Sequence, residues 1–321
     1  MEAVISFLTA TIRTATPIAL ATLACTISER AGVINIGIEG TMIASAFMGA
    51  VGAYFTGSAW IGLLLGALTG ILLAAIIAGL SIYCGGDQVV IGIGLNLLGP
   101  GLSYLIMYTI WGSRGTSPWL PGFSAVEIPL IKDIPILGDL ISGYNPCIYL
   151  CILLVLVMHF VIYHTRYGLR VRAAGENPTA LATVGVNVYR LRTSAVLWGG
   201  LMAGLAGVSL SLGTLNVFTN GMSADKGFLA YAANRFGQWT PGGSYLAALL
   251  FGSMESLRLR LQALDIAPQL LQMLPYVVTL LTLMFTGKRL RSPAADGVPY
   301  IHPISVPQAG KKQHKKAKKS A

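Results

Sequence analysis

Charged residues are scarce in this sequence, and their scarcity indicates its class. Asp, Glu, Lys and Arg make up only 11% of the 321 residues, whereas soluble domains carry about 25%. Hydrophobic residues make up 54% of the chain, and its mean hydropathy is +0.69. The composition therefore predicts an all-α, polytopic protein of the cell (plasma or inner) membrane.

Side chains that catalyse reactions or bind metals are also few. None of the four cysteines has the spacing of a zinc site, because Cys147 and Cys151 lack a His or a second Cys pair. His159 and His164 have no carboxylate or Cys partner at ligand spacing. We therefore expect no catalytic residue, metal or cofactor, and a membrane-embedded enzyme is the weaker interpretation.

The chain also lacks the loop that binds the phosphates of ATP. Gly287-Lys288 could end such a G-x-x-x-x-G-K loop, but position 282 holds Thr instead of the first Gly. The chain alone is therefore not expected to hydrolyse ATP.

Long apolar segments dominate what is present. A membrane crossing needs about 20 predominantly apolar residues. Segment 227–239 is shorter and is expected to be a short or re-entrant helix, and residues 28–30 are expected to form a polar turn. Together the segments predict about 8–10 transmembrane helices in a domain covering residues 1–290. Gly62, Gly66 and Gly70 predict a helix-packing face. Candidate crossings are residues 5–27, 31–55, 60–83, 88–110, 144–164, 193–213, 242–257 and 268–285.

Basic residues indicate which ends of these segments face the cytoplasm. Residues 291–321 are predicted to be a basic, disordered cytoplasmic tail that faces anionic lipid. The loop 111–143 is rich in proline and poor in basic residues, which favours the extracellular side. Counting segment 227–239 as a ninth crossing places the N-terminus outside and the C-terminus inside. If that segment is re-entrant instead, the Lys-rich tail moves outside, against the positive-inside trend. The tail's lysines are Lys311, Lys312, Lys315, Lys316, Lys318 and Lys319.

Residues 165–192 form a polar bridge between two apolar segments. The bridge holds five arginines and a single acid, which is typical of a cytoplasmic loop. Asn177 suits a helix N-cap, Pro178 the first helical position, and Gly185 the left-handed residue after the helix. The short helix between them could dock a partner protein or lie at the lipid headgroups, and the spacing leaves both open.

A few polar residues interrupt the apolar segments and could line a solute path. Asn35 and Glu39 are four residues apart, which would place them on one helix face. A carboxylate inside a membrane is costly unless it meets a partner or water. Asn96, Asn216 and Asn234 carry amides that both donate and accept, which suits a neutral polyhydroxyl or purine ligand. The alternative is that these side chains brace neighbouring helices.

Three stretches together resemble a permease subunit of a bacterial ABC importer. They are residues 29–50, 166–188 and 225–252. The resemblance is to the family shared by simple-sugar and branched-chain amino-acid permeases, closest to its nucleoside-uptake branch, and it covers roughly residues 15–288. Two features depart from the family pattern: the sequence YAANR at 231–235 and the Lys-rich tail.

The resemblance implies the function and the partners. Such a subunit moves a small polar solute, most often a nucleoside or a simple sugar, into the cell. It works with a second, often different, permease subunit, with separate ATP-binding subunits that hydrolyse ATP, and with an extracytoplasmic substrate-binding lipoprotein. The basic tail could bind nucleic acid, but its place after a membrane span favours anionic lipid, so we expect no nucleic-acid partner. The resemblance makes residues 173–185 the coupling helix that enters the ATPase, with the coupling residues Gly175, Glu176, Asn177, Pro178, Ala180 and Leu181.

The rival class is an ion-coupled or facilitative secondary transporter, in which broken helices also surround the substrate. Apart from Glu39, the apolar segments hold few ionisable groups of the kind that proton-coupled carriers use. The residues therefore favour the ATP-driven importer.

Overall fold

The computed structural model describes residues 2–113, 115–126, 142–262 and 291–300, together with positions 270, 273, 277–280, 282 and 284. Its named elements are helices, and no strand longer than an isolated bridge occurs among the described residues. The helices are α1 (Glu2–Arg30), α2 (Ile38–Thr56), α3 (Ala59–Ala78), η1 (Gly79–Tyr83), α4 (Gln88–Trp111), α6 (Pro146–His164), α7 (Arg166–Glu176), α8 (Pro178–Thr183), α9 (Val188–Leu210), η2 (Ser211–Leu215), α10 (Lys226–Phe236) and α11 (Pro241–Leu261).

Within the described residues, six helices are long and apolar enough to cross a membrane. The predicted segments 60–83, 88–110 and 144–164 match three of these spans closely. Helix α11 has 21 residues but is less apolar than the six. The predicted segment 268–285 lies mostly outside the described residues. The protein is thus an all-α polytopic membrane protein.

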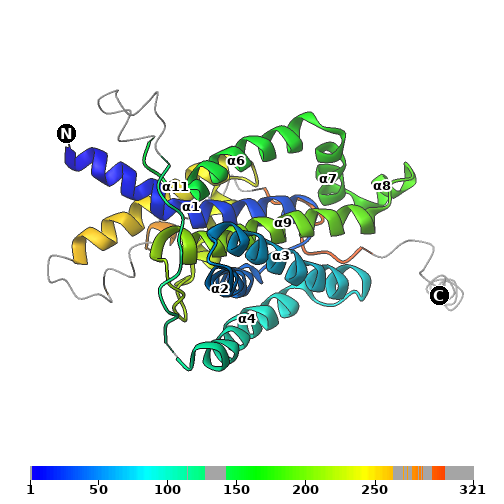
Figure 1. Ribbon diagram of the computed structural model, residues 1–321. Helices are drawn as coiled ribbons and strands as arrows, with labels where there is room; N and C mark the ends of the chain where they lie inside the picture. Colours follow the sequence, from blue (N-terminus) through cyan, green and yellow to red (C-terminus); the bar gives the residue numbers. More distant parts are fainter. Residues whose placement is uncertain are drawn as a thin grey trace, which may run out of the picture.

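Helices α1 and α9 form the centre of the bundle (Figure 1). Helix α9 packs against α1, α2 and α3, whereas α1 also contacts α10 and α11. The predicted glycine face is confirmed, because a Cβ on Gly70 would collide with the carbonyl oxygen of Gly200 in α9. A Cβ on Gly66 would lie 2.8 Å from the carbonyl oxygen of Ser45 in α2. Glycines therefore let these backbones touch.

The entry into α2 differs from the sequence prediction. Residues 31–37 are not helical, and Gly32 has a φ of +82°. Asn35 and Glu39 therefore do not share a helix face, and that expectation is wrong. The unwound backbone is satisfied by side chains of α4: Ile34 N donates to Gln88 Oε1 at 2.7 Å, and Asn96 Nδ2 donates to Ile36 O at 3.0 Å.

The end of α1 also differs from the prediction. Ser28, Glu29 and Arg30 form the last turn of α1 and not a polar turn between two helices. Their side chains find partners inside the protein, so the helix continues through them.

The polar bridge folds into two helices, only one of which was expected. The predicted short helix is α8, capped by Asn177, whose Oδ1 accepts from Ala180 N at 3.0 Å. Helix α7 precedes it, begins after the N-cap Thr165, and turns Val171 and Ala174 into the core. Figure 1 shows α7 and α8 at one end of the bundle.

Residues 291–300 lie at that same end. The sequence places them in the predicted disordered tail, but they pack against the bundle: Ala295 N donates to Gly175 O at 2.7 Å. The remaining tail, 301–321, lies outside the described residues.

Candidate functional site

Helix α8 presents a small surface held on a buried base. Glu176, Asn177 and Ala180 are exposed, and Val184, which follows the helix, is 76% exposed. The helix is fixed at both ends, by the Asn177 cap and by Gly185 at a φ of +81°. So short a helix is marginal in isolation, but these caps and its packing hold it.

Two of the predicted coupling residues are buried instead. Leu181 is part of the hydrophobic cluster that also contains Val171 and Leu191, so it anchors α8 to α7 and α9. Gly175 is buried where α7 meets the end of α1, and a Cβ there would collide with the carbonyl oxygen of Arg30. Pro178, at the first position of α8, is half-buried. These residues position the exposed surface.

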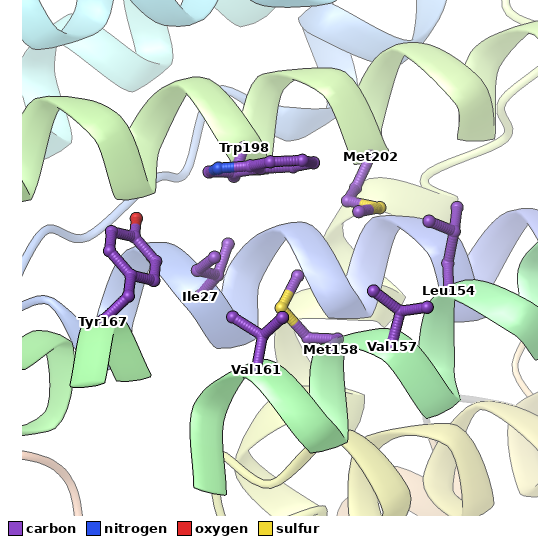
Figure 2. Close-up of a pocket in the computed structure, with 8 residues that line it drawn as sticks. All are labelled: Ile27, Leu154, Val157, Met158, Val161, Tyr167, Trp198 and Met202. Carbon is purple, nitrogen blue, oxygen red and sulfur yellow. The ribbon is translucent and has the colours of Figure 1, made fainter. Parts of the chain in front are cut away.

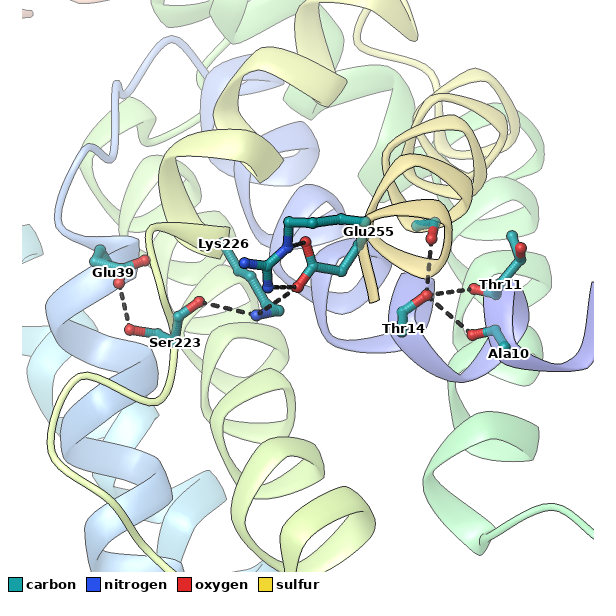
Figure 3. Close-up of polar contacts among 9 residues, drawn as sticks. Ala10, Thr11, Thr14, Glu39, Ser223, Lys226 and Glu255 are labelled. Carbon is teal, nitrogen blue, oxygen red and sulfur yellow. Dashed lines mark hydrogen bonds and ion pairs between the residues drawn. The ribbon is translucent and has the colours of Figure 1, made fainter. Parts of the chain in front are cut away.

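Glu39 joins α2 to the start of α10. Its Oε1 accepts a hydrogen bond from Ser223 Oγ (Figure 3). Its Oε2 accepts one from Gly227 N at 2.6 Å. The first N–H groups of a helix have no partner within the helix, and they favour negative charge. Glu39 therefore acts as a cap supplied from another helix, which accords with the bracing alternative.

Asn96 has a similar bracing position beside the unwound stretch. It donates to Ile36 O and its Oδ1 accepts from Gly40 N at 2.8 Å, so both ends of its amide serve the entry into α2. Asn35 lies in the same stretch and is only 3% exposed. Among the described residues its Oδ1 has no hydrogen-bond partner, which distinguishes it from Glu39, Asn96 and Asn234.

The structure does not bring the five predicted path residues to one point. Asn234, near the end of α10, accepts from Thr26 Oγ1 at 2.8 Å and donates to Glu29 Oε2 at 3.1 Å. Asn216 follows η2, at the other end of α9 from the polar bridge, with a φ of +54°. Its carbonyl accepts from Leu120 N at 2.8 Å. Contact of any of the five with a solute stays a prediction.

Sequence reasoning missed a buried polar cluster around Glu29. Its Oε2 also accepts from Trp239 Nε1, and Arg30 Nε donates to Trp239 O at 2.7 Å. Glu29 is fully buried, and its Oε1 has no hydrogen-bond partner in the described parts of the chain. Glu29 itself was the sequence signal for this cluster, since an acid at the end of an apolar segment requires partners. Only the fold shows that α10 supplies one of them, Asn234.

A second missed cluster lies at the other end of α10. Lys226 Nζ lies 4.0 Å from Glu255 Oε1 and donates to Ser223 O at 3.3 Å (Figure 3). Arg258 holds the same carboxylate with two nitrogens, at 2.9 and 2.5 Å. Glu39 and these three charges thus surround the first turn of α10 and fix it between α2 and α11.

Asp296, in the segment after the last helix, faces two arginines. Burial raises the pKa of this carboxyl from 3.8 to about 6, and the charges of Arg235 and Arg192 partly oppose that rise. Arg192 is almost completely buried at the start of α9, and its Nη1 donates to Val298 O at 2.9 Å. Asp296 and Arg192 therefore interact electrostatically in the folded protein.

An apolar pocket of about 260 Å³ lies between α1, α6, α7 and α9 (Figure 2). Trp198 and Met202 approach it from α9, and Met158 approaches it from α6. Tyr167 supplies the one hydroxyl of its lining, and that hydroxyl pairs with Ser194 Oγ at 3.0 Å. The pocket therefore has little to offer a polar solute.

Comparisons with known proteins agree with this architecture. The family described as branched-chain amino acid transport system / permease component matches residues 7–283. The chain is 37% identical to the guanosine ABC transporter permease protein NupQ of Bacillus subtilis, over 91% of this chain and 95% of that protein.

Two further relatives match at similar levels. They are the putative glucose ABC transporter permease protein TsgC13 of Haloferax volcanii (35% identical, 89% of this chain and 92% of that protein) and the nucleoside ABC transporter permease protein NupC of Lactococcus lactis (33% identical, 89% and 93%). No solved structure matches the chain significantly.

Proposed function

The chain belongs to the branched-chain amino acid transport system / permease component family, and from that premise we propose that it is the transmembrane subunit of an ATP-driven importer of nucleosides. The observation that carries the solute class is the likeness to a guanosine permease along almost the whole of both chains. The likeness to a putative glucose permease makes a simple sugar the alternative. The cell membrane is the proposed location.

ATP hydrolysis takes place in separate ATP-binding subunits, which dock on α8. The exposed surface of Glu176, Asn177, Ala180 and Val184 supports this docking, because it stands on a base fixed by Leu181. A displacement imposed on α8 is carried into α7 and α9 as a rigid-body movement, since packed interfaces do not deform continuously.

A second permease subunit completes the transport path. Helix α4 supports this proposal: it is apolar along 24 residues, but only 22% of its most apolar window is buried within this chain. We place the second permease against α4, and an extracytoplasmic lipoprotein at the end of the bundle opposite α8. The binding of substrate by that lipoprotein follows from the resemblance to importers of this kind.

Asn35 is the residue that we propose to contact the solute. It is buried, it lies on unwound backbone, and its Oδ1 has no partner within the part of the chain that the structure describes. An amide of this kind can accept from a ribose hydroxyl or a base N–H. Glu39 and Asn96 hold the backbone around Asn35, so they position the contact.

Purification of the full chain from membranes in mild detergent tests the class of transporter. Recovery of an ATPase, a second permease and a lipoprotein, followed by ATP-dependent uptake of labelled guanosine in liposomes, is the expected result. Labelled glucose in the same assay tests the alternative solute. Transport by this chain alone without ATP would show that it is a secondary transporter.

The docking role is tested by Glu176→Arg combined with Asn177→Pro. This double variant reverses a charge on the α8 surface and removes its cap. We expect normal membrane insertion with uptake uncoupled from ATP hydrolysis. The matched control is Leu156→Ala, at an exposed position in the middle of α6 to which no partner is assigned. Wild-type coupling in the double variant would contradict docking at α8.

A further inference from the structure

Residues 291–300, here called the strap, contact the base of the coupling helix. Ala295 N donates to Gly175 O at 2.7 Å, and a Cβ on Gly175 would lie 3.3 Å from Pro293 Cβ. Gly175 is the residue where α7 crosses the end of α1. The strap therefore contacts the junction of α1 and α7, directly before α8 begins.

The strap is also attached to the start of α9. Arg192 Nη1 donates to Val298 O at 2.9 Å, and Tyr189 OH donates to Tyr300 O at 3.2 Å. The rings of Tyr189 and Tyr300 meet edge to face, with their centroids 5.3 Å apart. These contacts cover the residues of α9 at which the polar bridge ends.

The strap has a third attachment, to the unwound stretch before α2. Gly32 lies so close that a Cβ there would be 2.6 Å from Arg192 Nη2 and 2.9 Å from Ala295 O. A Cβ on Gly297 would be 2.7 Å from Ile34 Cδ1. Three segments that are distant in sequence thus meet on the strap: the base of α8, the start of α9 and the entry into α2.

The strap also reaches one wall of a hollow beside α8. A cavity of about 290 Å³ is lined by Tyr300 of the strap, by Ala182 of α8, and by residues of the loop that leads into α9. A partner that docks on α8 would therefore lie next to the strap as well.

We propose that the strap is a positioning element for energy coupling, which carries a displacement of α8 to the unwound stretch that holds Asn35. The inference rests on the proposed docking of an ATPase at α8. Its positioning residues are Ala295 and Val298, which act through their backbone contacts with Gly175 and Arg192. The physical reason is that these segments share close backbone contacts with the strap, so a rigid shift of one displaces the others.

Hydrogen exchange in the purified importer complex tests the inference. Exchange at the amides of 291–300 and of 175–185 is compared between the nucleotide-free complex and the complex trapped with ATP and vanadate. We expect the protection of both segments to change together. A purely structural strap would stay equally protected in the two states.

The outcomes of this experiment separate the inference from the proposed function. A change in 175–185 without one in 291–300 overturns the strap proposal and leaves docking at α8 intact. No change in either segment while the ATPase is bound overturns both.

Two truncations give an independent functional readout. A chain that ends after position 290 lacks both the strap and the tail, whereas a chain that ends after Tyr300 lacks the tail alone. In the shorter chain, the amount of solute moved per ATP hydrolysed is expected to fall about 5- to 150-fold, the factor that typical coupling between two sites produces. The longer chain is expected to keep the wild-type ratio. A wild-type ratio in the shorter chain overturns the proposal, and if that chain fails to fold, the exchange experiment on the intact protein decides.

Discussion

Replacement of Glu39 distinguishes a bracing residue from a residue of the solute path. Its carboxylate accepts from Ser223 Oγ and Gly227 N and is almost completely buried. Glu39→Ala leaves the buried Gly227 N–H without a partner, which costs about 1–3 kcal/mol. It also removes a negative charge from the start of α10, which is worth about 0.3–2 kcal/mol. We therefore expect a total loss of about 1–5 kcal/mol in stability.

Glu39→Gln is the matched variant. Its carbonyl oxygen can still accept from Gly227 N–H, and the Ser223 hydroxyl can rotate to accept from the new amide. Only the charge at the helix start is lost, so we expect a cost of about 0.3–2 kcal/mol.

The assay combines the melting temperature of the purified complex with uptake kinetics per folded protein. A bracing Glu39 predicts a large fall in melting temperature for Ala, a small one for Gln, and an unchanged KM for both. A Gln variant with a normal melting temperature but a strongly raised KM would refute this reasoning and place the carboxylate in the solute path.

Three further predictions rest on single contacts. Gly175→Ala places a methyl group against the α1 carbonyl, and we expect a loss of about 1–3 kcal/mol, seen as a lower melting temperature; an unchanged value would contradict the close approach. Asn35→Ala should raise the KM for the transported nucleoside with little change in melting temperature, and an unchanged KM would remove Asn35 from the path. Because burial raises the folded-state pKa of Asp296 from 3.8 to about 6, the folded state binds more protons between these values, and stability falls as pH rises through them. Asp296→Asn should remove this part of the pH dependence, measured as melting temperature against pH; an identical profile would contradict it.

Several features of the fold could be predicted from residue patterns alone. The spans of α3, α4 and α6 match the expected segments closely because long apolar runs have few alternatives in a membrane. The ends of α8 could be predicted from Asn177, Pro178 and Gly185, because helix capping depends on residues that are close together in the chain.

Other features could not be predicted because they depend on contacts between distant segments. The stretch 31–37 has the apolar composition of a helix, yet it is unwound, since Gln88 and Asn96 of α4 satisfy its backbone. Helix α7 is a different case, because its N-cap Thr165 and the shared face of Val171 and Ala174 are local signals that were overlooked. Glu29 and Asn234 lie 205 positions apart, and nothing in either segment indicates their hydrogen bond.

Residue patterns alone establish that this is a polytopic membrane protein with an Arg-rich bridge and a capped helix, because composition, apolar length and capping are local properties. The tertiary structure decided how the polar residues are used. It pairs Glu39 with the start of α10 and Asn96 with unwound backbone, and it leaves the Asn35 oxygen without a partner among the residues described. It also joins the strap to Gly175. The physical reason is that a buried polar group is stable only beside a partner, and the fold alone sets which partners come within reach.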